Sequence, residues 1–474
     1  MRYGIPADTV ARLVRDWLPQ SLDWELVGGN RAVKTTAGQA PPDDPTAGQA
    51  PSSEATARQA PRISVIVPTY NRCGMLRQTL ESLAGQQFPS DEFEVIVADD
   101  GSSDDTAGMV RSFSGRLRLQ YCFQEDQGYR VAAARNAGAR LASSPILAFV
   151  DSGTLAGPDF VRGHLAAHAA GHGQRAVVGY CYGYRPLDEM SWLTAALAEV
   201  EPAQVVRRYG DDPSFADFRH SEFARADGDL GRLAAPWFLF WTVNCSVTAD
   251  VFWEAGGFDE NYRSWGGEDT ELGYRLFRRG VPFAVSRDAW TIELPHERHL
   301  NANFQSVGRN GRYFLKKHGE PMAEIAFGAF KDKAPGRIET DCAALASLTR
   351  EAADREVSAE LEKAAQDIPA EATVAVFGCG AVLPPSLPPC ILMDFDAHLL
   401  AQALADGRHT GHHAIGLRTP LRTRSVDIVI ITSRLSGLWD LWGERLLAEA
   451  RRIGHQVRGP LSGTEGLSPV RGRP

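Results

Sequence analysis

Acidic side chains occupy three places in the chain where they could take part in chemistry. Asp100 and Asp151 each follow a short apolar run, and the pair Glu268 and Asp269 follows two glycines. Arg135 lies in a segment of small residues, 128–141, that has helical spacing. A carboxylate can ligate a divalent cation or take up a proton, and the planar donor fork of an arginine can hold a phosphate or a base. A shared function requires that the fold bring these residues together.

The elements around these residues alternate between strands and helices. Apolar runs near 63–67, 95–98, 119–123 and 146–150 predict strands, and residues at helical spacing lie between them. This alternation predicts a parallel sheet, whose carboxyl-end edge is the usual ligand site. We expect the first strand to break at Pro68, and Tyr70 and Asp100 to face the same edge as Asp151, where a nucleotide would lie. For Asp151 alone, a strand end followed by a plain turn is the alternative.

Four segments, in this order and spacing, resemble the nucleotide-sugar half of a family-2 glycosyltransferase with the GT-A fold: SVIVPTYNR, VIVADDGSSDDT, GYRVAAARNAG and FVDSG. The segment GGFDENYRSWGGEDTELGYRLFRRG, 256–280, resembles the acceptor-side motif of these enzymes. The resemblance implies an α/β fold, with a mixed, mostly parallel sheet and helices on both faces, and a nucleotide-diphosphate sugar as the donor substrate. It assigns donor binding to Pro68, Thr69, Tyr70, Asp100, Arg135, Asp151 and Ser152, and acceptor or sugar contacts to Asn244, Trp265, Gly266 and Gly267.

The chemistry of sugar transfer gives the Glu-Asp pair a role. An acceptor must lose a proton while it attacks the anomeric carbon, and a nearby carboxylate can serve as the general base. We expect Asp269 to be that base and Glu268 to orient the acceptor or sugar. The dipole of a helix that begins here favours the ionised form of Asp269. A single displacement predicts inversion of the anomeric configuration. The alternative is an acidic pair that caps a surface helix.

The family's metal motif is Asp-x-Asp, and this chain departs from it because Gly153 takes the third position. The resemblance implies a divalent metal, Mn²⁺ or Mg²⁺, with Asp151 as one ligand. His296, in LPHERH, lies where related GT-A enzymes often carry a metal-binding histidine. An imidazole is a workable ligand, so we expect Asp151 and His296 to share the metal. For His296 or His299, an ordinary surface or core histidine is the alternative.

The C-terminal part has a pattern of its own. TVAVFGCGAVLPPSLPPCILMDFDAHLLAQAL, with Gly378, Gly380 and Asp394, resembles the first half of a class I S-adenosylmethionine-dependent methyltransferase. The segment around Asp427 resembles a later strand and helix of that fold. Because further strands are not evident, we expect a small, partial Rossmann-like domain that does not use S-adenosylmethionine. The predicted organisation is an N-terminal helical segment (1–35), a flexible repeat linker (36–61), a GT-A domain (62–319), a helical connector (320–370), the partial domain (371–457) and a disordered tail (458–474).

Composition limits the class of protein. The chain has 474 residues and a net charge of -9, with Lys and Arg spread out, which argues against nucleic acid as a partner. Seven cysteines without CxxC spacing, no long apolar run and no signal peptide favour a cytoplasmic enzyme without a membrane span. The acceptor is left open between a glycan, a peptide and a small natural product. Two other functions also stay open: a protein that only binds a nucleotide sugar or acceptor, and a bifunctional glycosyltransferase and methyltransferase.

Overall fold

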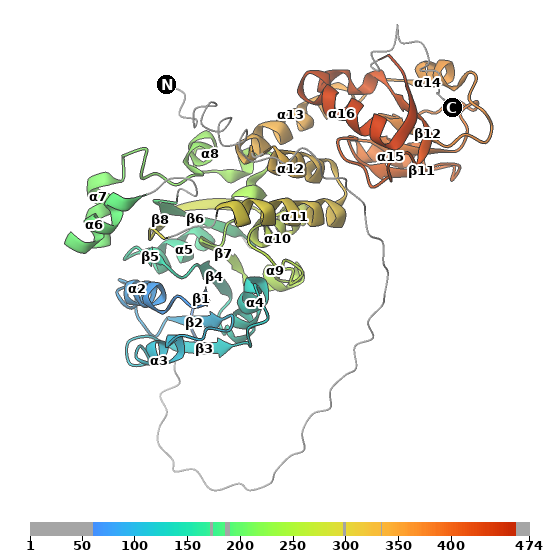
Figure 1. The fold of residues 1–474 in the computed structure, drawn as a ribbon. Coiled ribbons are helices and arrows are strands. Elements are labelled where there is room, and N and C mark those ends of the chain that lie inside the picture. Colours follow the sequence, from blue (N-terminus) through green and yellow to red (C-terminus); the bar gives the residue numbers. More distant parts are fainter. Residues whose placement is uncertain (1–59, 171–173, 185–189, 297–299, 333, 461–474) are drawn as a thin grey trace. The chain divides into compact units, whose positions relative to one another are not determined.

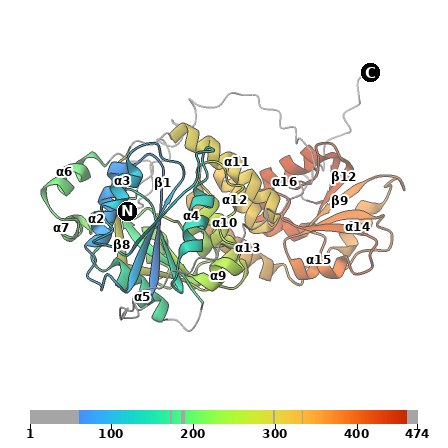
Figure 2. The ribbon, with the colours of Figure 1, turned by 90° about the horizontal axis from the view of Figure 1, so that it is seen from below.

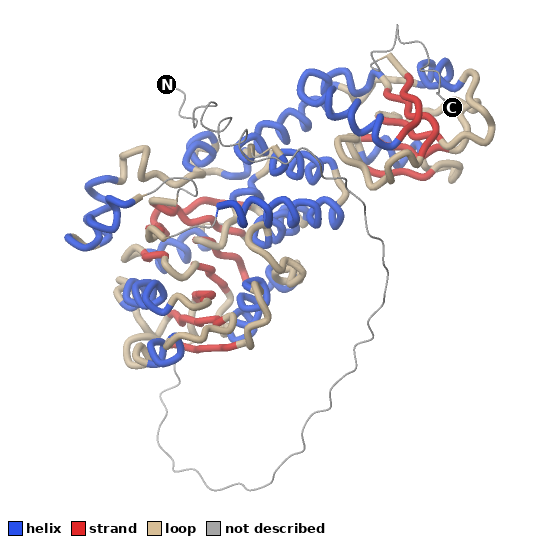
Figure 3. The backbone as a smooth tube through the Cα atoms, in the orientation of Figure 1, coloured by secondary structure: helices blue, strands red, loops and turns tan. Residues whose placement is uncertain are grey.

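A computed structural model of the chain describes residues 60–170, 174–184, 190–296, 300–332 and 334–460. The predicted N-terminal helical segment, the linker except for its last two residues, and all but the start of the predicted tail lie outside the described residues. Within the described ranges the strands form two separate sheets (Figure 3). Among the helices of these ranges, none combines the length and apolar character needed to cross a membrane.

The larger sheet has eight strands in the order β3-β2-β1-β4-β7-β6-β8-β5 (Figure 1). Strands β1 to β4 are parallel, whereas β7 runs antiparallel to both β4 and β6. This is the mixed, mostly parallel sheet that was predicted. Its strands are β1 (Ile63–Thr69), β2 (Phe93–Asp99), β3 (Leu119–Phe123), β4 (Ile146–Val150), β5 (Thr154–Ala156), β6 (Ala176–Tyr182), β7 (Asn244–Thr248) and β8 (Phe283–Glu293).

The predicted end of the first strand was wrong. Strand β1 continues through Pro68, which is paired in register with Ala98 of β2. A proline fixes a φ value that an extended chain tolerates, and it removes only its own N–H from the ladder. Near the end of a strand that loss costs little, so Pro68 does not break β1.

Helices cover both faces of the larger sheet (Figure 2). Successive side chains of a strand point to opposite faces, so Val65 and Val67 pack in one core with α2, α3 and α5, whereas Ile66 packs in another with α4, α9 and α10. The helices of this domain are α2 (Cys73–Ala84), α3 (Thr106–Arg111), α4 (Val131–Leu141), α5 (Phe160–Ala169), α6 (Ser191–Glu199), α7 (Pro202–Tyr209), α8 (His220–Arg225), α9 (Ala249–Glu254), α10 (Glu268–Arg278) and α11 (Leu300–His318), with short 3₁₀ helices η1 (Leu230–Arg232) and η2 (Pro236–Leu239).

The smaller sheet has five parallel strands in the order β11-β10-β9-β12-β13. The sequence predicted only three of them, because β11 (TGHH) and β13 (GHQVR) are short edge strands without an apolar run. Helices α12 (Pro321–Lys331), α13 (Ile338–Glu351) and α14 (Ser358–Ala365), with η3 (Pro335–Arg337), precede this sheet. Its elements are β9 (Val374–Phe377), β10 (Cys390–Asp394), α15 (Ala397–Ala403), β11 (Thr410–His413), β12 (Val426–Ile431), η4 (Ser433–Leu438), α16 (Trp439–Ile453) and β13 (Gly454–Arg458).

Candidate active site

The carboxyl ends of β1, β2 and β4 meet at one edge of the larger sheet. Thr69 and Asp99 are partners at the ends of β1 and β2, and Val150 at the end of β4 lies opposite Asn244 at the start of β7. The residues that follow these strand ends are Tyr70, Asp100 and Asp151. The prediction that they share one edge is confirmed.

At the β1 and β2 side of this edge, Asp100 holds a loop and Tyr70 faces solvent. The buried Asp100 carboxylate accepts hydrogen bonds from the Arg130 backbone N–H at 2.7 Å and from Gln124 Nε2 at 2.5 Å. Burial raises the pKa of Asp100. The Tyr70 side chain is 46% exposed, and its hydroxyl donates to Asp126 at 2.8 Å. Tyr70 is therefore placed to contact a ligand, whereas Asp100 positions the segment that leads into α4.

Two other predicted donor contacts lie inside the strand. Pro68 and Thr69 are buried within β1. Thr69 contributes its backbone carbonyl, which accepts from the Asp100 N–H at 2.9 Å. Both residues therefore shape the edge through the backbone.

A buried arginine joins the two halves of the site. The Arg135 guanidinium, on α4, donates to Asp151 Oδ1 and to Glu268 Oε1, each at 2.8 Å. The Glu268 side chain is 5% exposed and the Asp151 side chain is 40% exposed. Burial opposes the charge of Arg135, but Asp151 and then Glu268 raise its pKa. Because these carboxylates occupy the donor fork, Arg135 positions them, and the predicted direct contact with a phosphate or base is not what this geometry shows.

Two polar atoms of this cluster stand without a hydrogen-bond partner among the described residues. They are Glu268 Oε2 and Arg135 Nε, and both are buried. An unpaired buried carboxylate oxygen is costly, so Glu268 Oε2 points to a ligand that completes it. A hydroxyl group of a substrate is a suitable donor for Glu268 Oε2. Ser152 directly follows Asp151 in the chain, and its side chain is buried.

Asp269 lies next to this cluster in the first turn of α10. Its Oδ1 accepts from the Thr270 N–H at 2.7 Å, and its Oδ2 accepts from the Thr242 N–H at 3.3 Å. Burial, and then the Glu268 carboxylate, raise the pKa of Asp269 well above its usual range. The sequence predicted that the helix dipole favours the ionised form of Asp269. Burial and the neighbouring Glu268 charge act in the opposite direction.

The loop before α10 is fastened by a residue that the sequence did not single out. Asn310 of α11 donates through Nδ2 to the backbone carbonyl oxygens of Ser264, Trp265 and Gly266, the last at 2.6 Å. Gly266 and Gly267 have φ values of +87° and +103°, which strain any residue with a side chain. The Trp265 ring is 40% exposed. Gly266 and Gly267, to which the resemblance assigned acceptor or sugar contacts, thus form a tight turn between Trp265 and the Glu-Asp pair.

Among the residues that the structure describes, few side chains near Asp151 could bind the metal ion that was predicted there. In the described ranges no group of three or more His, Cys, Asp and Glu side chains could hold an ion. Gly153, where a second carboxylate was expected, has a φ of +94°, and a Cβ there would lie 2.3 Å from Met75 Cε. The segments that carry Asp151 and His296 do run side by side, because the Leu294 N–H donates to the Gly153 carbonyl at 2.9 Å. His299 lies outside the described residues.

Comparisons with known proteins identify the family to which the chain belongs. Residues 64–209 match the model of the glycosyl transferase family 2, and residues 234–299 match that of the N-terminal domain of galactosyltransferase. A relative from Streptomyces hygroscopicus subsp. limoneus, named validoxylamine A glucosyltransferase, is 44% identical over 85% of this chain and 91% of its own length. The chain belongs to glycosyltransferase family 2. It is a glycosyltransferase that acts on nucleotide sugars.

Two further proteins are less similar to this family-2 glycosyltransferase. The chondroitin synthase of Escherichia coli is 30% identical over 52% of this chain and 37% of its own length. Among solved structures, a mannosyltransferase from Pyrobaculum calidifontis in complex with GDP-Man and Mn²⁺ is 20% identical, with 65% of this chain and 79% of that chain covered and a TM-score of 0.40.

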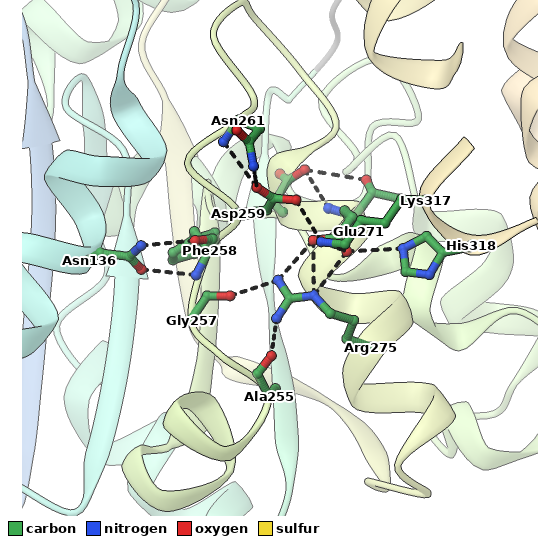
Figure 4. A network of polar contacts seen from close by, with 12 residues as sticks. Asn136, Ala255, Gly257, Phe258, Asp259, Asn261, Glu271, Arg275, Lys317 and His318 are labelled. Atoms are coloured by element: carbon green, nitrogen blue, oxygen red, sulfur yellow. Dashed lines mark hydrogen bonds and ion pairs between the residues drawn. The ribbon is translucent and has the colours of Figure 1, made fainter. Parts of the chain in front are cut away.

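A buried polar network holds α10 of the glycosyltransferase in place (Figure 4). The fully buried Glu271 accepts hydrogen bonds from Arg275, from Lys317 at 2.8 Å and from His318 at 3.0 Å. Arg275 in turn donates to the Gly257 carbonyl at 2.7 Å. Burial opposes ionisation, but the bonds from His318 and Arg275 lower the pKa of Glu271 to about 2. Because Glu271 lies one turn after Glu268, this network helps to set the position of the Glu268–Asp269 pair. Sequence alone did not show it, because its members are spread over α10, α11 and a loop.

One predicted acceptor contact of the glycosyltransferase lies in the core. The fully buried Asn244 donates to the Ala289 carbonyl at 2.7 Å, and its Oδ1 lies 2.9 Å from His164 Nε2. Its amide also donates to the Tyr180 carbonyl at 3.3 Å. Asn244 ties strands β6, β7 and β8 together from within the core.

Proposed function

We propose that this enzyme transfers glucose from a nucleotide-diphosphate glucose to a small polyhydroxylated acceptor of the validoxylamine A type, with inversion and with Asp269 as the general base. The observation that carries the proposal is the cluster in which Arg135 bridges Asp151 and Glu268 while Asp269 stands beside it with a raised pKa. The 44% identity to a validoxylamine A glucosyltransferase supports the choice of sugar and acceptor.

The two carboxylates of the pair have different surroundings, and this supports different roles. Glu268 is held by the Arg135 guanidinium at 2.8 Å and keeps one unpaired oxygen, which suits it to orient a substrate hydroxyl. The Asp269 carboxylate accepts from the backbone N–H groups of Thr242 and Thr270, and from the Thr270 hydroxyl at 3.3 Å. A base works best when its pKa lies near the working pH. The raised pKa of Asp269 therefore suits removal of the acceptor proton.

The residues at the end of β4 fit a divalent cation bound together with a diphosphate. Asp151 is partly exposed and keeps Oδ2 clear of the Arg135 bond, and a carboxylate oxygen is the ligand that Mn²⁺ and Mg²⁺ prefer. His296 Nδ1 lies 3.0 Å from the Leu294 carbonyl, which can only accept, so Nδ1 donates this bond. When bound, such a cation would neutralise the departing diphosphate. We propose Asp151 and His296 as its protein ligands.

Transfer is tested by incubating the enzyme with UDP-glucose, Mn²⁺ and validoxylamine A and measuring the product mass and its anomeric configuration. We expect one added hexose in β linkage. Asp269→Asn should abolish transfer while the affinity for UDP-glucose, measured by calorimetry, stays close to that of the wild type. Loss of donor binding would instead place Asp269 in the nucleotide site, and unchanged transfer would refute its role as base.

Asp250→Asn is the matched control for that experiment. Asp250 is an exposed carboxylate in the first turn of α9, a comparable place in another helix. It should leave both transfer and donor affinity unchanged. If the wild-type enzyme binds UDP-glucose but neither hydrolyses nor transfers it, the function as a mere binding protein is favoured.

We also propose that the C-terminal sheet is Rossmann-like in strand order but holds no S-adenosylmethionine. Asp394, at the end of β10, would face such a ligand, yet its carboxylate accepts from Arg434 Nε at 2.9 Å and from the Gly380 N–H at 2.9 Å. Both side chains of this ion pair are fully buried. A Cβ on Gly378 would lie 2.8 Å from Thr432 Oγ1, so little room is left above the glycine turn.

The stretch between β9 and β10 supports the same conclusion, since residues 378–389 form no helix whose N-terminus could hold a ligand's anionic group. Millimolar S-adenosylmethionine should therefore leave the amide hydrogen exchange of residues around Gly378 unchanged. Protection of these amides would restore the bifunctional alternative.

A further inference from the structure

A partly exposed aromatic cluster lies beside the proposed base. Tyr184, Phe218 and Trp241, here called the aromatic platform, have Trp241 at their centre. The Trp241 ring centroid is 5.4 Å from that of Tyr184 and 6.2 Å from that of Phe218, with the latter pair close to parallel at 28°. Phe218 is 36% exposed. A hydrogen bond of 3.2 Å from the Phe218 N–H to the Tyr184 carbonyl joins the two backbone segments that carry these residues.

A buried ion pair holds the platform from beneath. Asp217 and Arg219, the residues on either side of Phe218, are fully buried and bonded in a bidentate manner, with Nε to Oδ1 at 3.0 Å and Nη2 to Oδ2 at 2.7 Å. Arg219 also donates to the Leu239 carbonyl at 2.9 Å, and its guanidinium carbon lies 5.0 Å from the Trp241 ring centroid. The backbone at Phe218 is thereby fixed while its ring faces solvent. If Phe218 served only the hydrophobic core, its side chain would not need to face solvent from a backbone that the Asp217–Arg219 ion pair holds in place.

Most other aromatic residues of this region are buried and belong to the core. Trp237 and Phe240 are fully buried, as are Tyr180 and Phe215. The region between β6 and β7 thus contains two kinds of aromatic side chain, which its sequence does not distinguish. The platform residues are partly exposed, and Trp241 directly precedes Thr242, whose backbone N–H donates to Asp269.

The platform lies on the acceptor side of the site. Trp241 is followed by Thr242, whose backbone N–H donates to Asp269 Oδ2 at 3.3 Å. Tyr184 follows β6 and Trp241 precedes β7, and both strands lie beyond β4 from β1 and β2, where Tyr70 marks the proposed nucleotide side. Asp151 at the end of β4 and Asp269 therefore lie between the nucleotide side and the platform.

We propose that Tyr184, Phe218 and Trp241 form the acceptor subsite and stack on the C–H face of a sugar or cyclitol ring. This inference rests on the proposed transferase function. Such a ring has apolar C–H faces and a rim of hydroxyl groups, so a flat aromatic surface can bind its face while its rim hydroxyls meet Asp269 and Glu268. The platform selects an acceptor by ring shape and leaves donor binding untouched.

Phe218→Ala tests the platform, because Phe218 is the most exposed of the three rings and the Asp217–Arg219 pair still holds the backbone. With validoxylamine A as the probe and saturating UDP-glucose, we expect the acceptor KM to rise by about 3- to 10-fold. The KM for UDP-glucose and the rate of its hydrolysis without acceptor should stay within about 2-fold of wild type. Trp253→Ala, which removes an exposed ring on α9 over Arg140, is the matched control and should change neither constant.

An unchanged acceptor KM in Phe218→Ala overturns the platform but not the transferase function. A second measurement needs no turnover: validoxylamine A should change the tryptophan fluorescence of the wild type, and Trp241→Phe should remove most of that change. A fluorescence change that persists in Trp241→Phe refutes the subsite. If the wild type neither hydrolyses nor transfers UDP-glucose, the proposed function fails. The fluorescence measurement with validoxylamine A would still show whether the platform binds an acceptor.

Discussion

Replacing Glu271 by glutamine measures how strongly the buried network holds α10. The carboxylate receives hydrogen bonds from Arg275, Lys317 and His318, and its pKa falls from 4.5 to about 2 in the folded protein. A fall of this size corresponds to about 3 kcal/mol of folding free energy at neutral pH. Because the folded-state pKa lies below the unfolded one, this stability is present above about pH 4.5 and is lost as the pH falls toward 2. Glu271→Gln should therefore lower the free energy of unfolding by about 3 kcal/mol at pH 7, and by only about 1 kcal/mol at pH 3.

Urea unfolding of the wild type and the variant at the two pH values provides the measurement. Glu254→Gln, which neutralises an exposed carboxylate on α9, is the control and should change stability by less than about 0.5 kcal/mol. An equal deficit of Glu271→Gln at pH 7 and pH 3 would show that lost packing, and not lost charge, explains the effect. A deficit below about 0.5 kcal/mol at pH 7 would refute the idea that the network fixes α10.

Three further outcomes follow from the site. The raised pKa of Asp269 means that transfer should increase with pH along a limb that lies well above pH 4, and a limb near pH 4 in kcat would contradict its role as base. Asp151→Asn and His296→Ala should each weaken Mn²⁺ binding in the presence of UDP, measured by electron paramagnetic resonance, and unchanged binding in both would remove them as ligands. Asn310→Ala should raise the susceptibility of the Trp265 loop to proteolysis and lower kcat/KM, whereas an unaltered cleavage pattern would show that the three carbonyl bonds are dispensable.

Sequence patterns predicted the edge of the sheet well, because the information is local. Each apolar run is long enough to mark a buried strand, and the polar residue after it must stand at the strand's carboxyl end. Tyr70, Asp100 and Asp151 were placed in this way. The start of α10 was also predictable, since the glycine pair and the acidic first turn lie together in the chain.

The contacts that decide the role of each residue were beyond sequence reasoning. Arg135 and Glu268 are 133 positions apart, and nothing local indicates that the donor fork of Arg135 meets two carboxylates. The resemblance assigned Asn244 an acceptor or sugar contact, but three strands close around its side chain. Asn310 and Lys317 act from a helix that has no motif of its own.

The difference between Glu268 and Asp269 arises from their surroundings and not from their chemistry. Neighbouring residues in the first turn of a helix share one dipole, so the dipole cannot separate their roles. Arg135 separates them, because its guanidinium donates to Glu268 at 2.8 Å, whereas the Asp269 carboxylate accepts from Thr242 and Thr270. The charge that Arg135 stabilises on Glu268 then acts, after burial, to raise the pKa of Asp269. Arg135 acts directly to lower the pKa of Asp269, so burial and the Glu268 charge together outweigh it, and the raised pKa is what the proposed role of Asp269 as base requires.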